Sequence, residues 1–311
     1  HRDLHSFPTR RSSDLDEAID DYIIHLKGEN SWMLGRFIIP LSKLNELDRF
    51  VPLFDEIGAL ELAVLGNGGN SDDEYLSNIS NDMAQISDYR KKHTGKVRIK
   101  VYESKLPSNS PSKETMKKAT DLLNQNKLSH YHEFPELPDV GINYSTNEDE
   151  SSWNEEILPV ISMIAELEGA GIKLRCGGIV KKAFPSVEQM AAMIQTCALI
   201  DIPMKCTAGL HHPIRHFAKE YDAYMHGFIN TFGAGVFTSN FPNPENSQER
   251  FRMFTLLSHL IGDQAADNFD FGDEGMIWKV GDDRDSIFEF DNDSIKNCRG
   301  KIGRASCRER V

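Results

Sequence analysis

Short apolar runs rich in β-branched residues alternate with longer amphipathic stretches through residues 34–208, and this rhythm restricts the fold more than any other feature. The predicted strands are 34–40, 60–66, 97–103, 129–134, 171–177 and 202–208. The predicted helices between them lie near 43–57, 73–94, 112–126, 153–169 and 187–200. Repeated strand–helix units build either a closed (β/α)8 barrel or an open doubly wound sheet.

The barrel is the favoured of these two folds. No GxGxxG sequence follows the early strands, which argues against the dinucleotide-binding form of the open sheet. We therefore predict a single α/β domain over residues 16–301, a (β/α)8 TIM-type barrel. Because a closed barrel needs eight strands, the missing ones are expected in 16–33, in 275–280 or outside this chain. The alternative is a barrel left incomplete because the chain is truncated at both ends.

Three helix starts show the spacing of a capping box, in which a Ser or Asn precedes a Glu or Gln by three residues. The pairs are Ser152 with Glu155, Ser186 with Gln189 and Asn246 with Glu249. The apolar stretch 225–237 fits a buried strand or a helix equally well, because its periodicity does not distinguish them.

The two ends of the chain resemble translated sequencing-adapter DNA. Residues 5–15 read HSFPTRRSSDL and residues 302–311 read IGRASCRERV. One codon choice for the first segment has a reverse complement that encodes the second. We therefore interpret 1–15 and 302–311 as non-native segments and exclude them from the fold prediction. Without their six Arg and three acidic residues, the formal net charge of −13 becomes −16.

The charge balance limits the partners that this chain can have. Its 48 acidic residues outnumber 35 Lys and Arg, which argues against general binding to nucleic acid or to anionic lipid surfaces. No window approaches eighteen uninterrupted apolar residues, so no membrane-spanning helix is expected. Scattered cysteines without close pairs favour a reducing cytoplasm. The expected partner is a small anionic substrate bound in a local basic pocket, and a homo-oligomer is compatible with the sequence.

Basic residues near the ends of two neighbouring predicted strands indicate the site, because sites of α/β proteins form at the carboxyl ends of strands. The period of two places one set of residues on the inward face of each strand. These sets are Lys173, Arg175 and Gly177 in one strand, and Lys205, Thr207 and Gly209 in the next. Buried cations need anions, supplied either by the substrate or by protein carboxylates. The candidate carboxylates are Glu61, Glu103 and Glu133, so both interpretations stay open.

A Schiff-base mechanism is the first hypothesis for these residues, because crowding by other cations favours the neutral, nucleophilic form of a lysine. Lys205 is the preferred nucleophile and Lys173 the second candidate. Thr207 lies on the same face as Lys205 and is expected to take part in proton transfer, with Glu133 as a further catalytic candidate. The residues expected to bind substrate are Lys173, Arg175, Gly177, Gly178, Gly209 and His226. Ordinary strand-to-loop turning is the alternative role for the three glycines.

Histidines are dense just after the last predicted strand, at His211, His212, His216 and His226. His211 and His212 are acid/base candidates. His212 and His216 are spaced i, i+4, so one helix face can present both to a metal, with Pro213 in its first turn. No HExxH or HxH accompanies them. We therefore expect no cofactor, and a divalent metal ion at His212 and His216 is the alternative.

The segments KLRCGG, AFPSVEQ, MKCTAGLHHPIRHF and MHGFINTF resemble an uncharacterised family of bacterial proteins with a presumed (β/α) barrel, over most of residues 30–290. A weaker similarity links the lysine strands to Schiff-base aldolases of the deoxyribose-phosphate type, with Lys-x-Ser-Thr-Gly and Lys-x-Ser-Gly-Gly patterns. Here their order is reversed and the Ser positions are not kept. The resemblance implies a barrel, and the similarity implies lyase chemistry.

The expected function is an enzyme of the lyase or aldolase kind that acts on a small anionic carbonyl or sugar-phosphate-like compound. A metal-dependent hydrolase or isomerase that uses the four histidines is the second hypothesis. The third is a non-catalytic barrel that binds an anionic metabolite.

Overall fold

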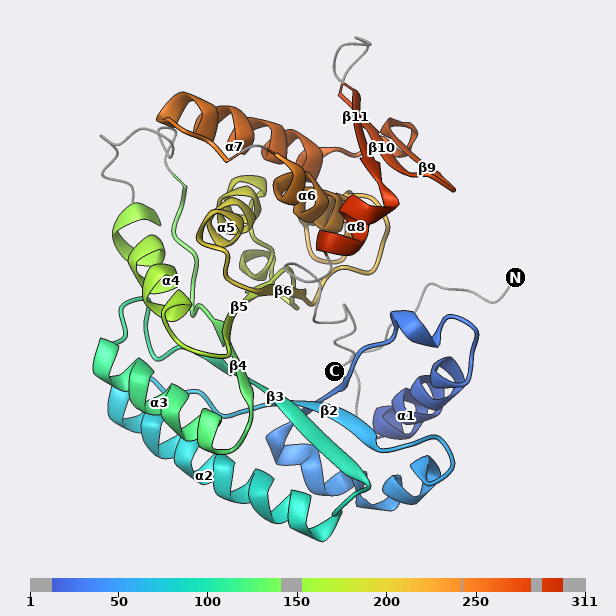
Figure 1. The fold of residues 1–311 in the computed structure, drawn as a ribbon, viewed down its shortest axis with the longest axis vertical. Coiled ribbons are helices and arrows are strands. Elements are labelled where there is room, and N and C mark those ends of the chain that lie inside the picture. Colours follow the sequence, from blue (N-terminus) through green and yellow to red (C-terminus); the bar gives the residue numbers. More distant parts are fainter. Residues whose placement is uncertain (1–12, 141–152, 242, 281–286, 299–311) are drawn as a thin grey trace.

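A computed structural model describes residues 13–140, 153–241, 243–280 and 287–298 as an α/β protein built around one curled parallel sheet (Figure 1). Its six strands follow one another in chain order, and each is parallel to its neighbour. They are β1 (Phe37–Pro40), β2 (Leu60–Leu65), β3 (Val97–Lys105), β4 (Ser129–Glu133), β5 (Ala170–Arg175) and β6 (Met204–Thr207). All six predicted strands are confirmed, with ends that differ by three residues or fewer.

Eight α-helices occur in the described residues. They are α1 (Ser13–Leu26), α2 (Asp72–Lys92), α3 (Lys113–Gln125), α4 (Leu158–Ala165), α5 (Val187–Ile200), α6 (Phe228–Asn240), α7 (Ser247–Gly262) and α8 (Asn292–Cys298). Short 3-10 helices cover Ser31–Met33, Leu41–Arg49, Val51–Phe54, Lys181–Ala183 and Ala266–Asn268, and a π-helical turn covers Trp153–Ile157. The helices predicted at 73–94, 112–126 and 187–200 are confirmed as α2, α3 and α5. The one predicted at 43–57 is instead two 3-10 helices.

The predicted closed (β/α)8 barrel is wrong. The sheet curls into a half-barrel, and within the described residues no seventh or eighth parallel strand closes it. Segment 16–33, expected to supply a strand, lies in α1 and the 3-10 turn after it, because Leu15, Ala18, Ile19 and Tyr22 are buried at helical spacing. Segment 275–280 provides a strand of a separate antiparallel sheet.

That second sheet has three strands in the order β11-β10-β9. They are β9 (Phe269–Gly272), β10 (Gly275–Lys279) and β11 (Ile287–Asp291). It packs beside α6 and α8, where Phe237 of α6 meets Trp278 and Phe288 edge to face. Stretch 225–237, undecided from sequence, lies mainly in α6, whose small residues Gly233, Ala234 and Gly235 are buried against neighbouring elements.

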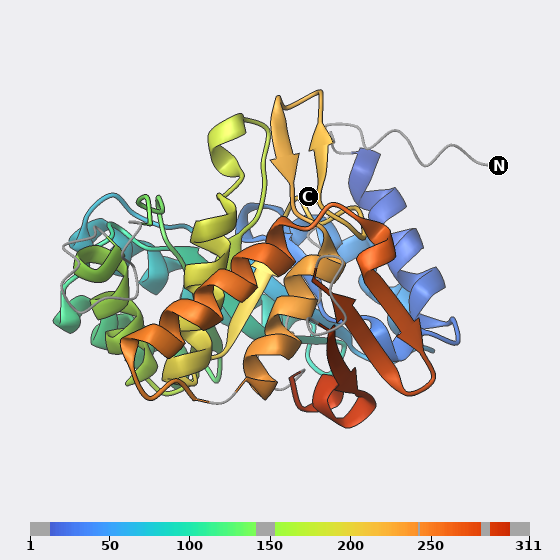
Figure 2. The same ribbon diagram turned by 90° about the horizontal axis from the view of Figure 1, so that it is seen from above.

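After β6 the chain forms a two-stranded antiparallel ribbon, β7 (His216–Ala218) and β8 (Ala223–Met225), instead of another βα unit. Figure 2 shows this ribbon projecting from one end of the molecule. Its two strands pair with each other in a separate sheet and do not extend the parallel one, so the barrel rhythm stops at this point of the chain.

The two faces of the curled sheet differ in their covering. Helices α2 to α5 pack on the outer face, which carries the main apolar core, including Leu62, Ile99 and Ile172 (Figure 1). The inner face carries a small separate apolar cluster of Ile38, Ala63, Val101 and Tyr131, with Leu65 packed against it. Because side chains alternate along a strand, each strand contributes to both faces.

The capping predictions can be compared with the structure at two helices. At α5, Ser186 and Gln189 form the full capping box, and at α7 the Asn246 side chain accepts a hydrogen bond from the Glu249 N–H at 2.9 Å. Ser152 lies outside the described residues. Residues 1–12 and 302–311 also lie outside the described residues, whereas 13–15 form the first turn of α1. The non-native origin of both ends stays a prediction. Within the described ranges, no helix is long and apolar enough to cross a membrane.

Candidate functional site

Two lysines and two glutamates meet on the inner face of the sheet, and we call them the lysine–glutamate cluster. Lys173 of β5 and Lys205 of β6 are register partners. Lys173 Nζ lies 3.1 Å from Glu103 Oε2 and 3.0 Å from Glu133 Oε2, while Lys205 Nζ donates a hydrogen bond to Glu103 Oε1. The side chains of Lys173, Lys205 and Glu103 are at most 5% exposed. The predicted inward orientation of both lysines is therefore confirmed.

Protein carboxylates pair with both of these lysines. Two cations face two carboxylates, so the cluster is balanced in formal charge. Glu61, the third candidate carboxylate, instead pairs with Arg98 at 3.1 Å, where both side chains are partly exposed. The crowding by cations expected from the sequence is thus offset by Glu103 and Glu133, and each lysine has a nearby proton acceptor.

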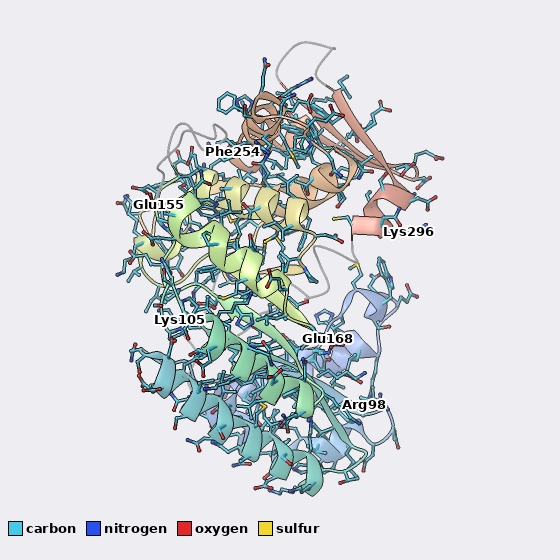
Figure 3. The ribbon with its side chains drawn as sticks, turned by 60° about the vertical axis from the view of Figure 1, so that its left-hand side comes forward. Arg98, Lys105, Glu155, Glu168, Phe254 and Lys296 are labelled. Atoms are coloured by element: carbon cyan, nitrogen blue, oxygen red, sulfur yellow. The ribbon has the colours of Figure 1, made fainter. Side chains whose placement is uncertain are left out.

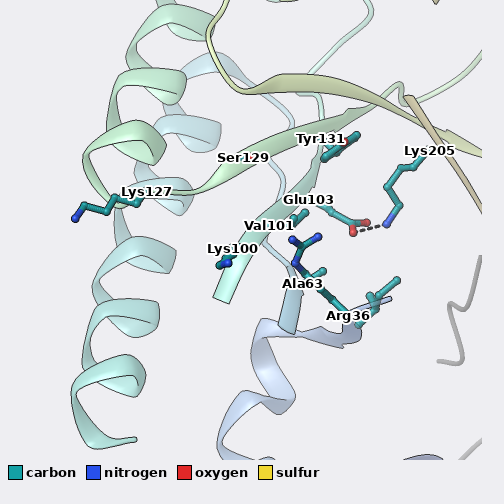
Figure 4. Close-up of a pocket in the computed structure, with 10 residues that line it drawn as sticks. Arg36, Ala63, Lys100, Val101, Glu103, Lys127, Ser129, Tyr131 and Lys205 are labelled. Atoms are coloured by element: carbon teal, nitrogen blue, oxygen red, sulfur yellow. Dashed lines mark hydrogen bonds and ion pairs between the residues drawn. The ribbon is translucent and has the colours of Figure 1, made fainter. Parts of the chain in front are cut away.

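A cavity of about 290 Å³ lies beside the cluster, on the inner face of the sheet (Figure 4). Lys205 and Glu103 line it, together with Ala63 and Tyr131. Ser129 and residues near the amino-terminal halves of the strands also line it, so the cavity extends toward the amino ends rather than the carboxyl ends expected from barrel proteins. Figure 3 marks the two ends of β3 by Arg98 and Lys105.

The charged side chains around this cavity are mostly basic. The cations are Arg36, Lys100, Lys127 and Lys205, whereas Glu103 is the single carboxylate among the lining residues of the described chain. In a chain with a formal charge of −13, this lining is thus a local concentration of basic side chains.

Sequence reasoning missed Arg36. It directly precedes β1 and shares the strand parity of Ile38, so extending the inward face of the predicted strand by one period of two would have identified it. In Figure 4 its guanidinium points toward the Glu103 carboxylate. Arg36 Nε is buried and has no hydrogen-bond partner in the described part of the chain.

The carboxyl ends of β5 and β6 hold the remaining predicted anion-binding residues, and local packing explains them. Arg175 is exposed and its Nε donates to the Gly177 carbonyl at 2.9 Å. A Cβ on Gly177 would lie 2.7 Å from Gly209 Cα, and one on Gly178 would lie 2.7 Å from Ala183 Cβ. Gly209 has φ +71°, and its Cβ would lie 2.7 Å from the Cys176 oxygen. These contacts favour the strand-to-loop turning role of the glycines.

Thr207 lies on the same face as Lys205, as predicted, at the carboxyl end of β6. Its register partner is Arg175. The side chain is buried, and its Oγ1 has no hydrogen-bond partner in the described ranges. A hydroxyl without a partner at this place keeps Thr207 as a candidate for proton transfer next to the cluster.

The predicted helix that presents His212 and His216 together is wrong, because the chain there forms a loop and strand β7, with Pro213 in the loop. The two imidazole rings nonetheless lie 4.1 Å apart. His211 and His212 are exposed. Across the described ranges, no three His, Cys, Asp or Glu side chains are grouped so that they could hold a metal ion.

His226 has a structural environment. It is fully buried, and its Nε2 lies 2.7 Å from the Pro185 carbonyl, to which it can donate a hydrogen bond. Burial, the largest influence, lowers the pKa of His226 to about 4, so the ring is neutral at pH 7. His226 therefore joins the loop before α5 to the start of α6. It is not among the described residues that line the cavity.

His132 belongs to the opposite face of the sheet from its neighbour Glu133. It packs against His130, with ring centroids 3.7 Å apart, and burial lowers the pKa of His132 to about 3. His130 Nε2 and Ser104 Oγ are 2.8 Å apart. The alternation of β4 thus separates the histidines under the helices from Glu133 in the cluster.

Comparison of the chain with protein-family models and with curated protein sequences finds no match. The fold and the site therefore carry the functional argument. They define an α/β protein whose curled parallel sheet holds a buried lysine–glutamate cluster beside a basic cavity.

Proposed function

We propose that this protein is an enzyme of the lyase or aldolase kind, which binds a small anionic carbonyl compound in the cavity and forms a Schiff base at Lys205. One observation carries the proposal: the Lys205 amine and the Glu103 carboxylate, joined by a hydrogen bond, line the same basic cavity. A nucleophile and a proton acceptor within hydrogen-bond reach are the pair that Schiff-base chemistry requires.

The proposed step uses these two groups. Protonated Lys205 gives one proton to Glu103, and the neutral amine attacks the carbonyl carbon. The C–N bond forms while the carbonyl electrons move to oxygen, which takes the proton from Glu103. The nitrogen then loses a second proton to that hydroxyl, again through Glu103, and water leaves. The product is a protonated imine that carries the positive charge originally on the lysine, so atoms and charge balance.

The other cluster residues have positioning roles in this proposal. Lys173 holds the second oxygen of Glu103 and is itself held by Glu133, which fixes the carboxylate beside Lys205. Lys173, Lys205 and Glu103 are at most 5% exposed, and their burial strengthens the interactions between these charges. Thr207, one period further along β6, supplies a hydroxyl toward the carboxyl end.

Borohydride trapping tests the proposal. The full chain is incubated with pyruvate, other 2-oxo acids or aldehydes, reduced with borohydride, and digested for peptide mass analysis. We expect a stable adduct on Lys205, and none in Lys205→Arg, which keeps a cation beside Glu103. Lys181→Arg is the matched control, because Lys181 is an exposed lysine paired with Asp222 at 3.0 Å. Absence of an adduct across the panel, or an adduct on Lys173 alone, contradicts the assignment.

A second candidate function is binding of an anionic metabolite without turnover. The balanced charges of the cluster favour it, because each lysine is already paired with a carboxylate. Saturable binding of a carboxylate with neither an adduct nor loss of substrate would select this function. A cytoplasmic location belongs to either proposal, since scattered cysteines without close sequence pairs favour a reducing compartment.

A further inference from the structure

Arg36 is the charged residue around the cavity whose position the lysine–glutamate cluster does not explain. Its guanidinium points across the inner face toward Glu103, yet the described residues offer it neither an ion pair nor a hydrogen bond (Figure 4). A guanidinium is always charged in proteins and seldom lies in a partly buried site without an anion. Within the described residues, the Arg36 guanidinium is therefore a charged donor without a paired anion.

The other lining cations are placed differently. Lys100 and Lys127 are exposed, and Lys127 points away from Glu103 in Figure 4. Arg36 is half-buried and lies beside Ala63 in the cavity lining, and in Figure 4 its guanidinium, the Glu103 carboxylate and the Lys205 amine follow one another across the inner face. A ligand held by Arg36 would therefore lie in the same cavity as the Lys205 amine.

We propose that Arg36 binds the carboxylate of the substrate and that the ligand is a short 2-oxo acid or a related small carboxylate. This inference rests on the proposed function and names the substrate class for the same site. A planar guanidinium matches a carboxylate with two parallel hydrogen bonds. The volume of about 290 Å³ is at the lower limit of small-molecule sites, which suits a ligand of a few carbon atoms.

A phosphate group fits the cavity less well. Phosphate sites in α/β proteins commonly use glycine-rich backbone or a helix N-terminus, whose N–H groups converge on the oxygens. The lining residues in the described part of the chain include no glycine and no first turn of a helix.

The test uses propionate, a carboxylate that has no carbonyl group and cannot form a Schiff base. Its dissociation constant is measured by NMR titration for the full chain, for Arg36→Ala and for Arg36→Lys, with inorganic phosphate as the second probe. Arg98→Ala is the matched control: Arg98 lies on the same side of the sheet near its amino end, but it pairs with Glu61 and does not line the cavity.

We expect propionate to bind the parent chain, and Arg36→Ala to weaken binding about ten- to hundredfold, as loss of hydrogen bonds between charged groups does. Arg36→Lys should lie between the two, and Arg98→Ala should bind like the parent. Thermal unfolding checks that each variant is folded, and the lysine variant keeps the test valid if the alanine variant is not.

Three results would overturn the inference: no propionate binding to the parent chain, equal binding by Arg36→Ala, or binding of phosphate in place of propionate. Failure of borohydride trapping is a separate outcome. If propionate binds through Arg36 but no 2-oxo acid forms an adduct on Lys205, the carboxylate site stands and the Schiff-base proposal fails.

Discussion

Replacement of Glu103 by Gln is the perturbation that most directly tests the cluster. Glu103 accepts from Lys205 and lies 3.1 Å from Lys173 Nζ, and its side chain is fully buried. In Glu103→Gln, Lys173 keeps Glu133 at 3.0 Å, but Lys205 retains no carboxylate partner among the described residues. Removing one partner of a buried ion pair leaves an uncompensated charge and costs about 3–5 kcal/mol. We expect the free energy of unfolding to fall by that amount.

Equilibrium unfolding in urea at pH 7, analysed by linear extrapolation, measures the effect. Glu61→Gln is the matched control, because the Glu61–Arg98 pair joins neighbouring strands of the same sheet but is partly exposed, and exposed pairs contribute about 0–1 kcal/mol. The double variant Glu103→Gln, Lys205→Met removes the orphaned cation, so it should be more stable than Glu103→Gln alone. If Glu103→Gln costs no more than Glu61→Gln, the cluster is not a buried ion-pair network and the reasoning fails.

Two further predictions concern the pH dependence of stability and the strand–loop packing. The pKa values of His132 and His226 are lowered to about 3 and about 4, from 6.5 in an unfolded chain, so the unfolded state takes up protons first. The stabilisation is complete above pH ~6.5 and is lost as the pH falls, by up to about 1.4 kcal/mol per pH unit for each histidine. Urea unfolding at pH 7 and pH 5 should show this loss, and the free energy of unfolding should depend less steeply on pH in His132→Gln. A free energy of unfolding that does not change with pH would contradict the prediction. Gly209→Ala should lower the free energy of unfolding by about 1–3 kcal/mol, because φ is +71° and the new Cβ meets the Cys176 oxygen at 2.7 Å. Gly95→Ala is the comparison in the same urea assay, because Gly95 has φ +79° but open space around its Cβ. It therefore separates the cost of the positive φ from the cost of the steric contact.

The strands were predictable from sequence because each is a short apolar run, and those runs bury the outer face under helices whatever the closure of the sheet. The closure was not predictable in the same way. A rhythm of strands and helices fixes the local units, but the number of strands depends on where the rhythm stops, here at the ribbon β7–β8. The helical spacing of Leu15, Ile19 and Tyr22 was present in the sequence and argued against a strand there.

The candidate site was predictable where the period of two applied within a clear strand. It identified Lys173, Lys205 and Thr207 as inward, whereas Glu103 and Glu133 were candidate carboxylates because they lie at or near other predicted strands. It did not reach Arg36, which lies just outside β1. Density alone misled for the histidines, because a cluster in sequence fixes no geometry: His226 contacts the Pro185 carbonyl, whereas His211 and His212 are exposed.

The pairing of Glu103 with Lys205 also bears on the shape of the sheet. Strands β3 and β6 are three positions apart in the sheet order, which is about 14 Å along a sheet with the usual strand spacing of about 4.8 Å. Their inward side chains meet because the sheet curls, so the ion pair favours the curled form over a flat one. The same two side chains line the cavity, and changes to either should therefore alter stability and ligand binding together.

Arg36 differs from both in this respect, because it has no partner in the cluster. Its replacement should weaken carboxylate binding while leaving the free energy of unfolding nearly unchanged, whereas replacement of Lys205 should change both. A protein that only binds an anion would show the same separation at Arg36, but it would form no adduct at Lys205. The two residues together thus distinguish a structural cluster, a binding site and a catalytic site on one face of one sheet.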